Sequence, residues 1–411
     1  MNNEKPVHAP LSQFEVVGGE VLIGGLQLGR LARRVGSTPF YAYDRAKLIE
    51  RVHHVRSLLP QTVRLHYSIK ANPMPALVQQ MAVLVDGLDV ASAGELRTAL
   101  DTGIDPATIS FAGPGKTDAE LSQAIAAGVM INVESSKEID RAARIGDALG
   151  IAPQIVMRVN PDFELKNSGM RMSGGAKPFG IDAEMVPMCA RQIDSLGITL
   201  QGLHIFSGSQ SLKAMAIAES HTQAFELARR LADATRQVIP GLYLGAGFGI
   251  PYFAGEQRLD LSPICENLQK LTDSLDQQLP ATRVSLESGR YLVGEAGLYV
   301  ARVIDRKESR GVIFLVTDGG LHHHLAASGN FGQVIRKNYP VAVGSRMADK
   351  EHETVTIVGP LCTPLDILAD KVELPRADVG DLIVIFQSGA YGFSASPVAF
   401  LGHPPPLEVL V

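Results

Sequence analysis

The chain has 411 residues, 45% of them hydrophobic and 20% charged, which predicts two globular domains at about 100–200 residues each. Its formal net charge of −5 excludes the broad basic surface that attracts nucleic acid or anionic membranes. The polar N-terminus, the absence of an apolar run long enough for a bilayer, and three widely spaced cysteines (Cys189, Cys265, Cys362) predict a cytoplasmic protein without signal peptide, membrane span or disulfide framework.

Short apolar strands alternate with helical stretches from about residue 40 to residue 285. Most of these strands precede a helix, a pattern typical of a parallel (β/α)8 barrel and therefore of the α/β fold class. The expected strands are residues 40–44, 65–72, 87–92, 108–114, 129–135, 154–161, 200–208 and 241–249.

The sequence becomes rich in β-strand patterns after about residue 285. We therefore expect a barrel over residues 39–284 and an all-β domain over residues 285–411, joined by an N-terminal β segment over residues 1–38. A polar, glycine-rich insertion at residues 166–180 interrupts the barrel. Long insertions after barrel strands are usually functional, although a mobile loop with two solvated cations is the simpler interpretation.

Lys70 ends a strand in which Leu65, Tyr67 and Ile69 alternate with polar residues, and this alternation predicts a half-buried strand. Two interpretations stay open for Lys70: a side chain lying along the surface, or an amine at the mouth of a pocket. Because the carboxyl ends of barrel strands face the active site, other polar residues at strand ends would lie near it. These are Asp89, Arg158 and His204.

Of two glycine-rich turns, one is a candidate phosphate site. Residues 244–252 (LGAGFGIPY) differ from the dinucleotide fingerprint, but their backbone N–H groups could bind a phosphate near the last barrel strands; a simple tight turn is the alternative. Residues 113–117 (GPGKT) are not a P-loop, because Ser110 stands where that motif needs glycine.

A lysine amine and a phosphate site in one barrel mouth suggest pyridoxal 5'-phosphate, bound to Lys70 as a Schiff base. Glu287 ends an apolar strand and could pair with the pyridine nitrogen, keeping it protonated. Arg290 could bind the phosphate or organise the site. A buried structural pair between Glu287 and Arg290 remains the alternative.

Seven motifs, in family order and over nearly the whole chain, resemble the fold-type III pyridoxal-phosphate decarboxylases, the group of diaminopimelate and ornithine decarboxylases. They are YSIKANP, GLDVASAGEL, HIFSGSQ, GAGFGIPY, ESGRYLVGEAG, GPLCTPLDIL and SGAYGFSASP. The resemblance implies a barrel of the alanine-racemase type with a β-domain, in a homodimer whose subunits share active sites.

By this resemblance Lys70 is the Schiff-base lysine, Glu287 faces the pyridine nitrogen, and Cys362 of the partner subunit returns a proton to Cα. A core cysteine is the alternative for Cys362. The implied phosphate contacts are Ser209, Gly245, Gly247 and Tyr391, and the remaining cofactor contacts are Asp89, Arg158, His204, Phe206 and Arg290.

Departures from the family pattern narrow the range of expected substrates. Phe206 stands where the family usually has a histidine stacked on the cofactor, and Thr363 stands where an acidic residue binds a distal amine. We therefore expect an L-amino acid or aminoacyl derivative other than ornithine or diaminopimelate. Residues 321–337 replace a carboxylate-binding segment and resemble a subgroup that decarboxylates glutamate tethered to an acyl carrier protein, or one associated with exopolysaccharide systems. Diaminopimelate decarboxylation and racemisation are the alternative activities.

Three consecutive histidines, residues 322–324, raise the question of a metal. We expect none, because successive strand residues point in alternate directions and at most two would share a face. Substrate contacts by His323 and His324 are expected, with a solvated turn as the alternative.

Overall fold

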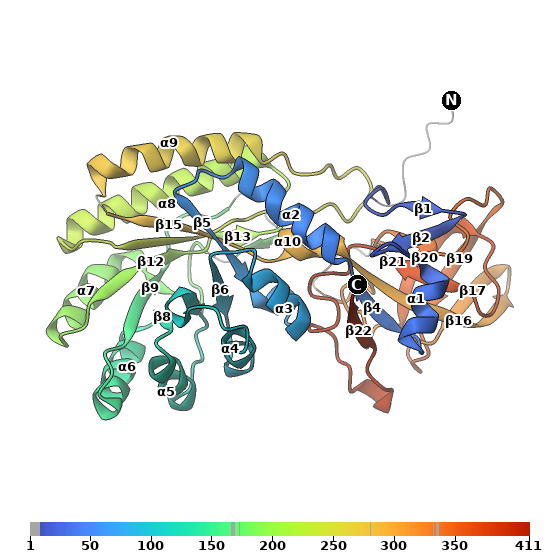
Figure 1. Cartoon of the computed structure of the whole chain (residues 1–411), viewed down its shortest axis with the longest axis horizontal. Helices are drawn as coiled ribbons and strands as arrows, with labels where there is room; N and C mark the ends of the chain where they lie inside the picture. The colour runs from blue at the N-terminus through green and yellow to red at the C-terminus, as the bar shows by residue number, and fades with distance from the viewer. Residues whose placement is uncertain (1–8, 166–168, 172, 280, 332, 334–336) are drawn as a thin grey trace. The chain divides into compact units, whose positions relative to one another are not determined.

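The computed structural model describes residues 9–411 except 166–168, 172, 280, 332 and 334–336 (Figure 1). The chain divides into two compact units. One consists of residues 51–250 and 259–291, and the other of residues 1–50, 251–258 and 292–411. Each unit is described by itself.

The first unit is a closed barrel of eight parallel strands. In sheet order these are β9 (Gln154–Asn160), β12 (Leu200–Ile205), β14 (Gly241–Gly245), β15 (Arg283–Ser288), β5 (Val63–Ser68), β6 (Gly87–Val90), β7 (Ile109–Phe111) and β8 (Met130–Val133). Pairing of β8 with β9 closes the barrel, and β11 (Ile181–Asp182) pairs with the carboxyl end of β9.

Helices cover the outside of the barrel strands (Figure 1). They are α2 (Arg45–Leu58), α3 (Pro75–Ala82), α4 (Ala93–Leu100), α5 (Asp118–Ala127), α6 (Ser136–Leu149), α7 (Val186–Ser195), α8 (Ala214–Thr235) and α9 (Ser262–Gln278). The short helix α10 (Arg290–Val293) follows β15. Local sequence defines their ends. Thr117 and Glu120 form a capping box at the start of α5, and Gly128 ends this helix with a φ of 76°.

The second unit contains an eight-stranded sheet of mixed direction. Its strands are β4 (Phe40–Tyr43), β16 (Gly297–Ser309), β17 (Val312–Thr317), β18 (Val341–Val343), β19 (His352–Val358), β20 (Ile367–Pro375), β21 (Leu382–Ile385) and β22 (Leu407–Leu410). A small sheet of β1 (Val16–Val17), β2 (Glu20–Ile23) and β3 (Leu26–Gln27) precedes α1 (Leu28–Val35) in this unit. Two further strands, β10 (Met170–Arg171) and β13 (Gly208–Ser209), pair with each other beside the barrel.

The predicted fold class, a parallel barrel with a separate β-domain, is confirmed, but one strand differs. Residues 40–44 were expected to open the barrel, whereas β4 pairs with β16 and β22 in the second sheet. The eighth barrel strand is β15, which pairs with β14 and β5 and extends past the expected boundary at residue 284.

The prediction of a half-buried strand before Lys70 was wrong. Arg64 is exposed as expected, but His66 and Ser68, which were expected on the same polar face, are buried with exposed fractions of 2% and 5%. The physical reason is the closed barrel, because helices cover one face of each strand and the barrel interior covers the other. Within the described residues, no helix is long and apolar enough to cross a bilayer.

Candidate active site

Lys70 lies in the turn that follows β5, beside a buried carboxylate. Its Nζ is 3.9 Å from Asp89 Oδ2 at the end of β6, and the Lys70 side chain is 40% exposed while that of Asp89 is 3% exposed. The same Nζ lies 5.4 Å from the centre of the Phe206 ring. The amine is therefore held between an acidic and an aromatic side chain, which favours the pocket interpretation over a lysine lying along the surface.

The pKa of the Asp89 carboxyl is raised to about 6 by burial and by the nearby charge of Glu287. Lys70 acts in the opposite direction and favours the ionised carboxylate. A buried carboxyl with a shifted pKa beside an accessible amine is typical of a functional site.

Glu287, in β15, forms a buried pair with His204, in β12. Glu287 Oε2 lies 3.1 Å from His204 Nε2, and both side chains are at most 3% exposed. Burial alone would raise the pKa of Glu287, but His204, His66 and Lys70 together hold it below its ordinary value. Glu287 Oε1 has no hydrogen-bond partner among the described residues, so this buried carboxylate can accept a hydrogen bond from a bound cationic group.

The glycine-rich turn after β14 packs closely against the segment after β12. A Cβ on Gly245 would lie 2.2 Å from the Phe206 ring, and Gly247 has a φ of 76°. The Ser211 amide donates to the Gly247 carbonyl at 3.0 Å, which links the two segments. Glycine is therefore required at residue 245 by packing and at residue 247 by conformation.

Arg158 and Ser209 hold different positions around the barrel. Arg158, in β9, lies in register with His204 of β12, and its Nη1 is 2.7 Å from Glu134 Oε1. Ser209 belongs to the short β13, and Arg290 lies half-buried at the start of α10. Their contacts with a cofactor stay predictions.

Cys362, Thr363 and Tyr391 belong to the second unit. Cys362 is exposed in the loop between β19 and β20, which disfavours the core-cysteine alternative. The adjacent Thr363 is half-buried, and its amide donates to the Leu361 carbonyl at 2.8 Å. Tyr391 has a φ of 54°, an uncommon conformation for a residue other than glycine.

The three histidines 322–324 lie in a turn, but the turn is not solvated as one alternative held. All three are buried, with exposed fractions of at most 1%. His323 Nε2 lies 2.9 Å from the Pro404 carbonyl, and His324 Nε2 lies 2.9 Å from Ser388 Oγ. No cluster of metal-ligating side chains is found among the described residues. Substrate contacts by His323 and His324 remain a prediction.

Comparison with known proteins decides the family. Residues 45–294 match the model of the pyridoxal-dependent decarboxylase family, specifically its pyridoxal-binding domain. The chain belongs to this family. It is 37% identical to the L-glutamyl-[BtrI acyl-carrier protein] decarboxylase of Niallia circulans, over 91% of this chain and 88% of that protein. It is 32% identical to the diaminopimelate decarboxylase of Aquifex aeolicus, over 97% of this chain and 92% of that protein.

A solved structure agrees with this assignment. The diaminopimelate decarboxylase from M. jannaschii in complex with L-lysine superimposes with a TM-score of 0.86 at 25% identity, covering 97% of this chain and 93% of that one. The predicted family, the pyridoxal phosphate cofactor and the decarboxylase activity are thereby confirmed.

The barrel residues of this decarboxylase fit pyridoxal phosphate. Lys70 offers an accessible amine, Glu287 Oε1 offers a buried acceptor without a partner among the described residues, and Gly245 leaves no room for a side chain against Phe206. When bound, the cofactor supplies an electron sink for the pair of electrons that loss of CO₂ leaves at Cα. The ionised Glu287 would favour a proton on the ring nitrogen, since it keeps its negative charge there.

Sequence reasoning missed several buried polar residues around this site. Glu134 directly follows β8, a position comparable to that of Asp89 near the end of β6. This position at a strand end could have marked Glu134 as a candidate site residue. His221, in α8, is buried with its Nε2 3.4 Å from the Gly245 carbonyl, and its helical position gave no such signal.

Proposed function

We propose that this decarboxylase acts on an L-amino acid tethered to an acyl carrier protein, with a glutamyl group as the first candidate. The observation that carries the proposal is Thr363, which follows Cys362 and offers a hydroxyl where a carboxylate would be needed to pair a distal ammonium group. The 37% identity to a decarboxylase of a glutamyl carrier protein supports the same substrate class.

Within this function, Lys70 would hold the cofactor covalently, and Glu287 would accept a hydrogen bond from the protonated ring nitrogen. Gly245, Gly247, Ser209 and Tyr391 would bind its phosphate. The bond between Cα and the carboxylate carbon breaks, CO₂ leaves, and the Cys362 thiol supplies the proton that Cα gains. A thiol is suited to this step because its ordinary pKa lies within reach of neutral pH.

We further propose that the protein is a cytoplasmic homodimer in which Cys362 acts on the partner subunit's substrate. The free state of all three described cysteines supports a reducing compartment. Light scattering should give twice the mass of one chain. A monomer with full activity would contradict the shared site.

The deciding experiment is a screen for CO₂ release. The substrates are free glutamate, free lysine, ornithine, diaminopimelate, and glutamate loaded on an acyl carrier protein. We expect efficient release only from the loaded carrier protein, with unloaded carrier protein as the control. Efficient turnover of diaminopimelate would instead assign the activity of the Aquifex relative, and turnover of any free diamino acid would contradict the role given to Thr363.

Racemisation on the same scaffold is a weaker candidate. The carboxylate of Glu287 favours a strong electron sink, whereas a racemase benefits from a weaker one that limits side reactions. The same assay decides the point, since a racemase would invert the amino acid without releasing CO₂.

A further inference from the structure

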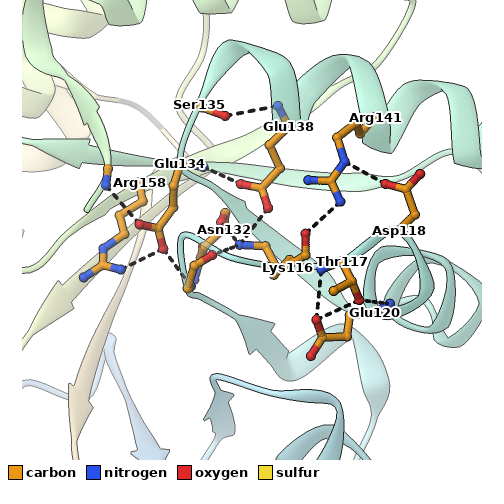
Figure 2. Close-up of polar contacts among 12 residues, drawn as sticks. Lys116, Thr117, Asp118, Glu120, Asn132, Glu134, Ser135, Glu138, Arg141 and Arg158 are labelled. Atoms are coloured by element: carbon orange, nitrogen blue, oxygen red, sulfur yellow. Dashed lines mark hydrogen bonds and ion pairs between the residues drawn. The ribbon is translucent and has the colours of Figure 1, made fainter. Parts of the chain in front are cut away.

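Two buried ion pairs lie side by side at the carboxyl ends of β7, β8 and β9 (Figure 2). Arg158 Nη1 lies 2.7 Å from Glu134 Oε1, and Lys116 Nζ lies 3.0 Å from Glu138 Oε1. All four residues are at most 7% exposed. Two buried cations and two buried carboxylates give a cluster without net charge, which is the arrangement that burial requires.

Lys116 uses all its donors within the protein. Lys116 Nζ donates to the carbonyls of Gly113 at 2.5 Å and Asn132 at 2.9 Å besides its ion pair with Glu138. An ammonium group has three N–H donors, so these three contacts use its full donor capacity. Lys116 therefore joins the ends of β7 and β8 and has nothing left for a ligand, which explains the buried lysine of the GPGKT segment.

Arg158 differs from Lys116 in this respect. Glu134 is the one hydrogen-bond acceptor found for its guanidinium among the described residues. The Phe179 ring centre lies 5.1 Å from its Cζ and covers the guanidinium plane. A guanidinium presents a rigid fork of several N–H donors, so Arg158 retains donors that the described residues do not use.

Glu134 determines where this fork lies. Its Oε1 also accepts the Gly113 amide at 2.6 Å, and its Oε2 accepts the Gly180 amide at 3.0 Å. Glu134 is thus fixed from both sides by backbone, and Figure 2 shows its carboxylate facing the Arg158 guanidinium.

Gly180 itself cannot move away easily. It has a φ of 78°, and a Cβ there would lie 2.8 Å from the Asn160 amide nitrogen in β9. The chain entering β11 therefore lies directly on the backbone of β9, next to Arg158.

We propose that Glu134 is a positioning residue that orients the Arg158 guanidinium toward the cofactor site of the barrel. Arg158 lies in register with His204, whose ring is 3.1 Å from Glu287, so the oriented cation occupies the strand position beside that pair. The Lys116 and Glu138 pair supports the backbone here, because Glu138 Oε2 accepts the Glu134 amide at 2.8 Å. Glutamine at residue 138 keeps an oxygen that can accept the same amide, so it removes the charge but not this contact.

Five full-length variants test the proposal: Glu134→Gln, Glu134→Asp, Arg158→Ala, the double variant Glu134→Gln/Arg158→Ala, and the matched control Glu138→Gln. The readouts are the melting temperature, the Kd for pyridoxal phosphate added to cofactor-free protein, and kcat/KM. Both Gln variants remove one buried carboxylate from the same cluster, so both should lower the melting temperature.

Only the variants at residues 134 and 158 should weaken cofactor binding. We expect Glu134→Gln to raise the Kd about tenfold and to lower kcat/KM about 10²-fold, as misplacement of a site group by about 1 Å can do. Glu138→Gln should leave both values within about twofold of wild type. Because Glu134 acts through Arg158, the double variant should show the Kd of Arg158→Ala and no additional loss.

A wild-type Kd in Glu134→Gln, or losses that multiply in the double variant, would overturn the proposal. If Glu134→Gln does not fold, Glu134→Asp tests the proposal instead. Aspartate keeps the negative charge, but its side chain is one methylene shorter, so the carboxylate lies farther from Arg158. A Kd raised several-fold supports the proposal, and an unchanged Kd overturns it. The Kd requires no substrate, so this result is independent of whether the proposed carrier-bound substrate is correct.

Discussion

Glu287 and His204 form a buried pair in which Oε2 lies 3.1 Å from Nε2, while the other carboxylate oxygen has no hydrogen-bond partner among the described residues. An unsatisfied buried carboxylate oxygen costs free energy in the folded protein. Its retention at the end of a barrel strand is understandable if a cofactor supplies the missing donor.

Replacing Glu287 with glutamine should lower kcat about 10²-fold, a magnitude typical of removing one electrostatic partner of the reacting group. The amide has nearly the same shape but cannot hold a proton on the ring nitrogen by charge. Steady-state kinetics of CO₂ release measure the effect. Glu353→Gln, which breaks the ion pair with Arg306 in the other unit, is the control for loss of a carboxylate. Equal rates for wild type and Glu287→Gln would remove the assigned role.

Lys70 should carry the cofactor covalently. The purified protein should be yellow, and borohydride should fix the cofactor to the peptide that contains Lys70, because reduction makes the Schiff-base bond permanent. Mass spectrometry of the digested protein locates the label. Lys70→Ala should lose the absorbance band, whereas the buried Lys116→Met should keep it. A colourless wild type that gains no band with added pyridoxal phosphate would exclude the assignment.

Cys362→Ala should keep the cofactor and lose about 10²–10⁴-fold in turnover, the usual contribution of a general acid. Cys362 is exposed and could deliver a proton to a bound molecule. The pKa of the buried Cys265 thiol is raised to about 11 by burial, so Cys265→Ala is a control without an acid to lose. Turnover that survives in Cys362→Ala would assign the proton to another group.

The barrel could be predicted because each strand and its helix are adjacent in sequence. Most expected strands lie where the structure has them. Asp89 and His204 lie near the carboxyl ends of β6 and β12, and Lys70 lies in the turn that follows β5. The prediction that residues 40–44 form a barrel strand was wrong, because the partners of β4 are β16 and β22, more than 200 residues away in the sequence. A short apolar strand carries no local signal for which sheet it joins.

Contacts between side chains of different strands could not be predicted from the sequence either. Glu134 and Arg158 meet only because the register of β8 and β9 places them together, and sequence spacing does not specify register. The buried histidines 322–324 were hidden for a similar reason. The hydrogen-bond partners of His323 and His324, Pro404 and Ser388, follow more than 60 residues later.

His221 should make the protein sensitive to mild acid. Burial lowers its pKa to about 4 from an ordinary value of 6.5. Below pH 6.5, His221 therefore binds a proton in the unfolded chain but stays neutral in the folded chain until the pH approaches 4. The stability from this residue is full above pH 6.5 and is lost as pH falls toward 4, by about 1.4 kcal/mol per pH unit and about 3 kcal/mol in all.

His221→Asn should make the free energy of unfolding less dependent on pH, because one proton fewer is bound on unfolding. The contributions of His66 and Asp89 are the same in both proteins and cancel in the comparison. Urea unfolding at pH 7.5 and pH 5 measures the difference, and the exposed His53→Asn serves as the control. The substitution also removes the ring beside the Gly245 carbonyl, so the variant should be less stable at pH 7.5 and differ less from wild type at pH 5. A gap between the two proteins that stays constant over this range would show that His221 is protonated equally in the folded and unfolded chains.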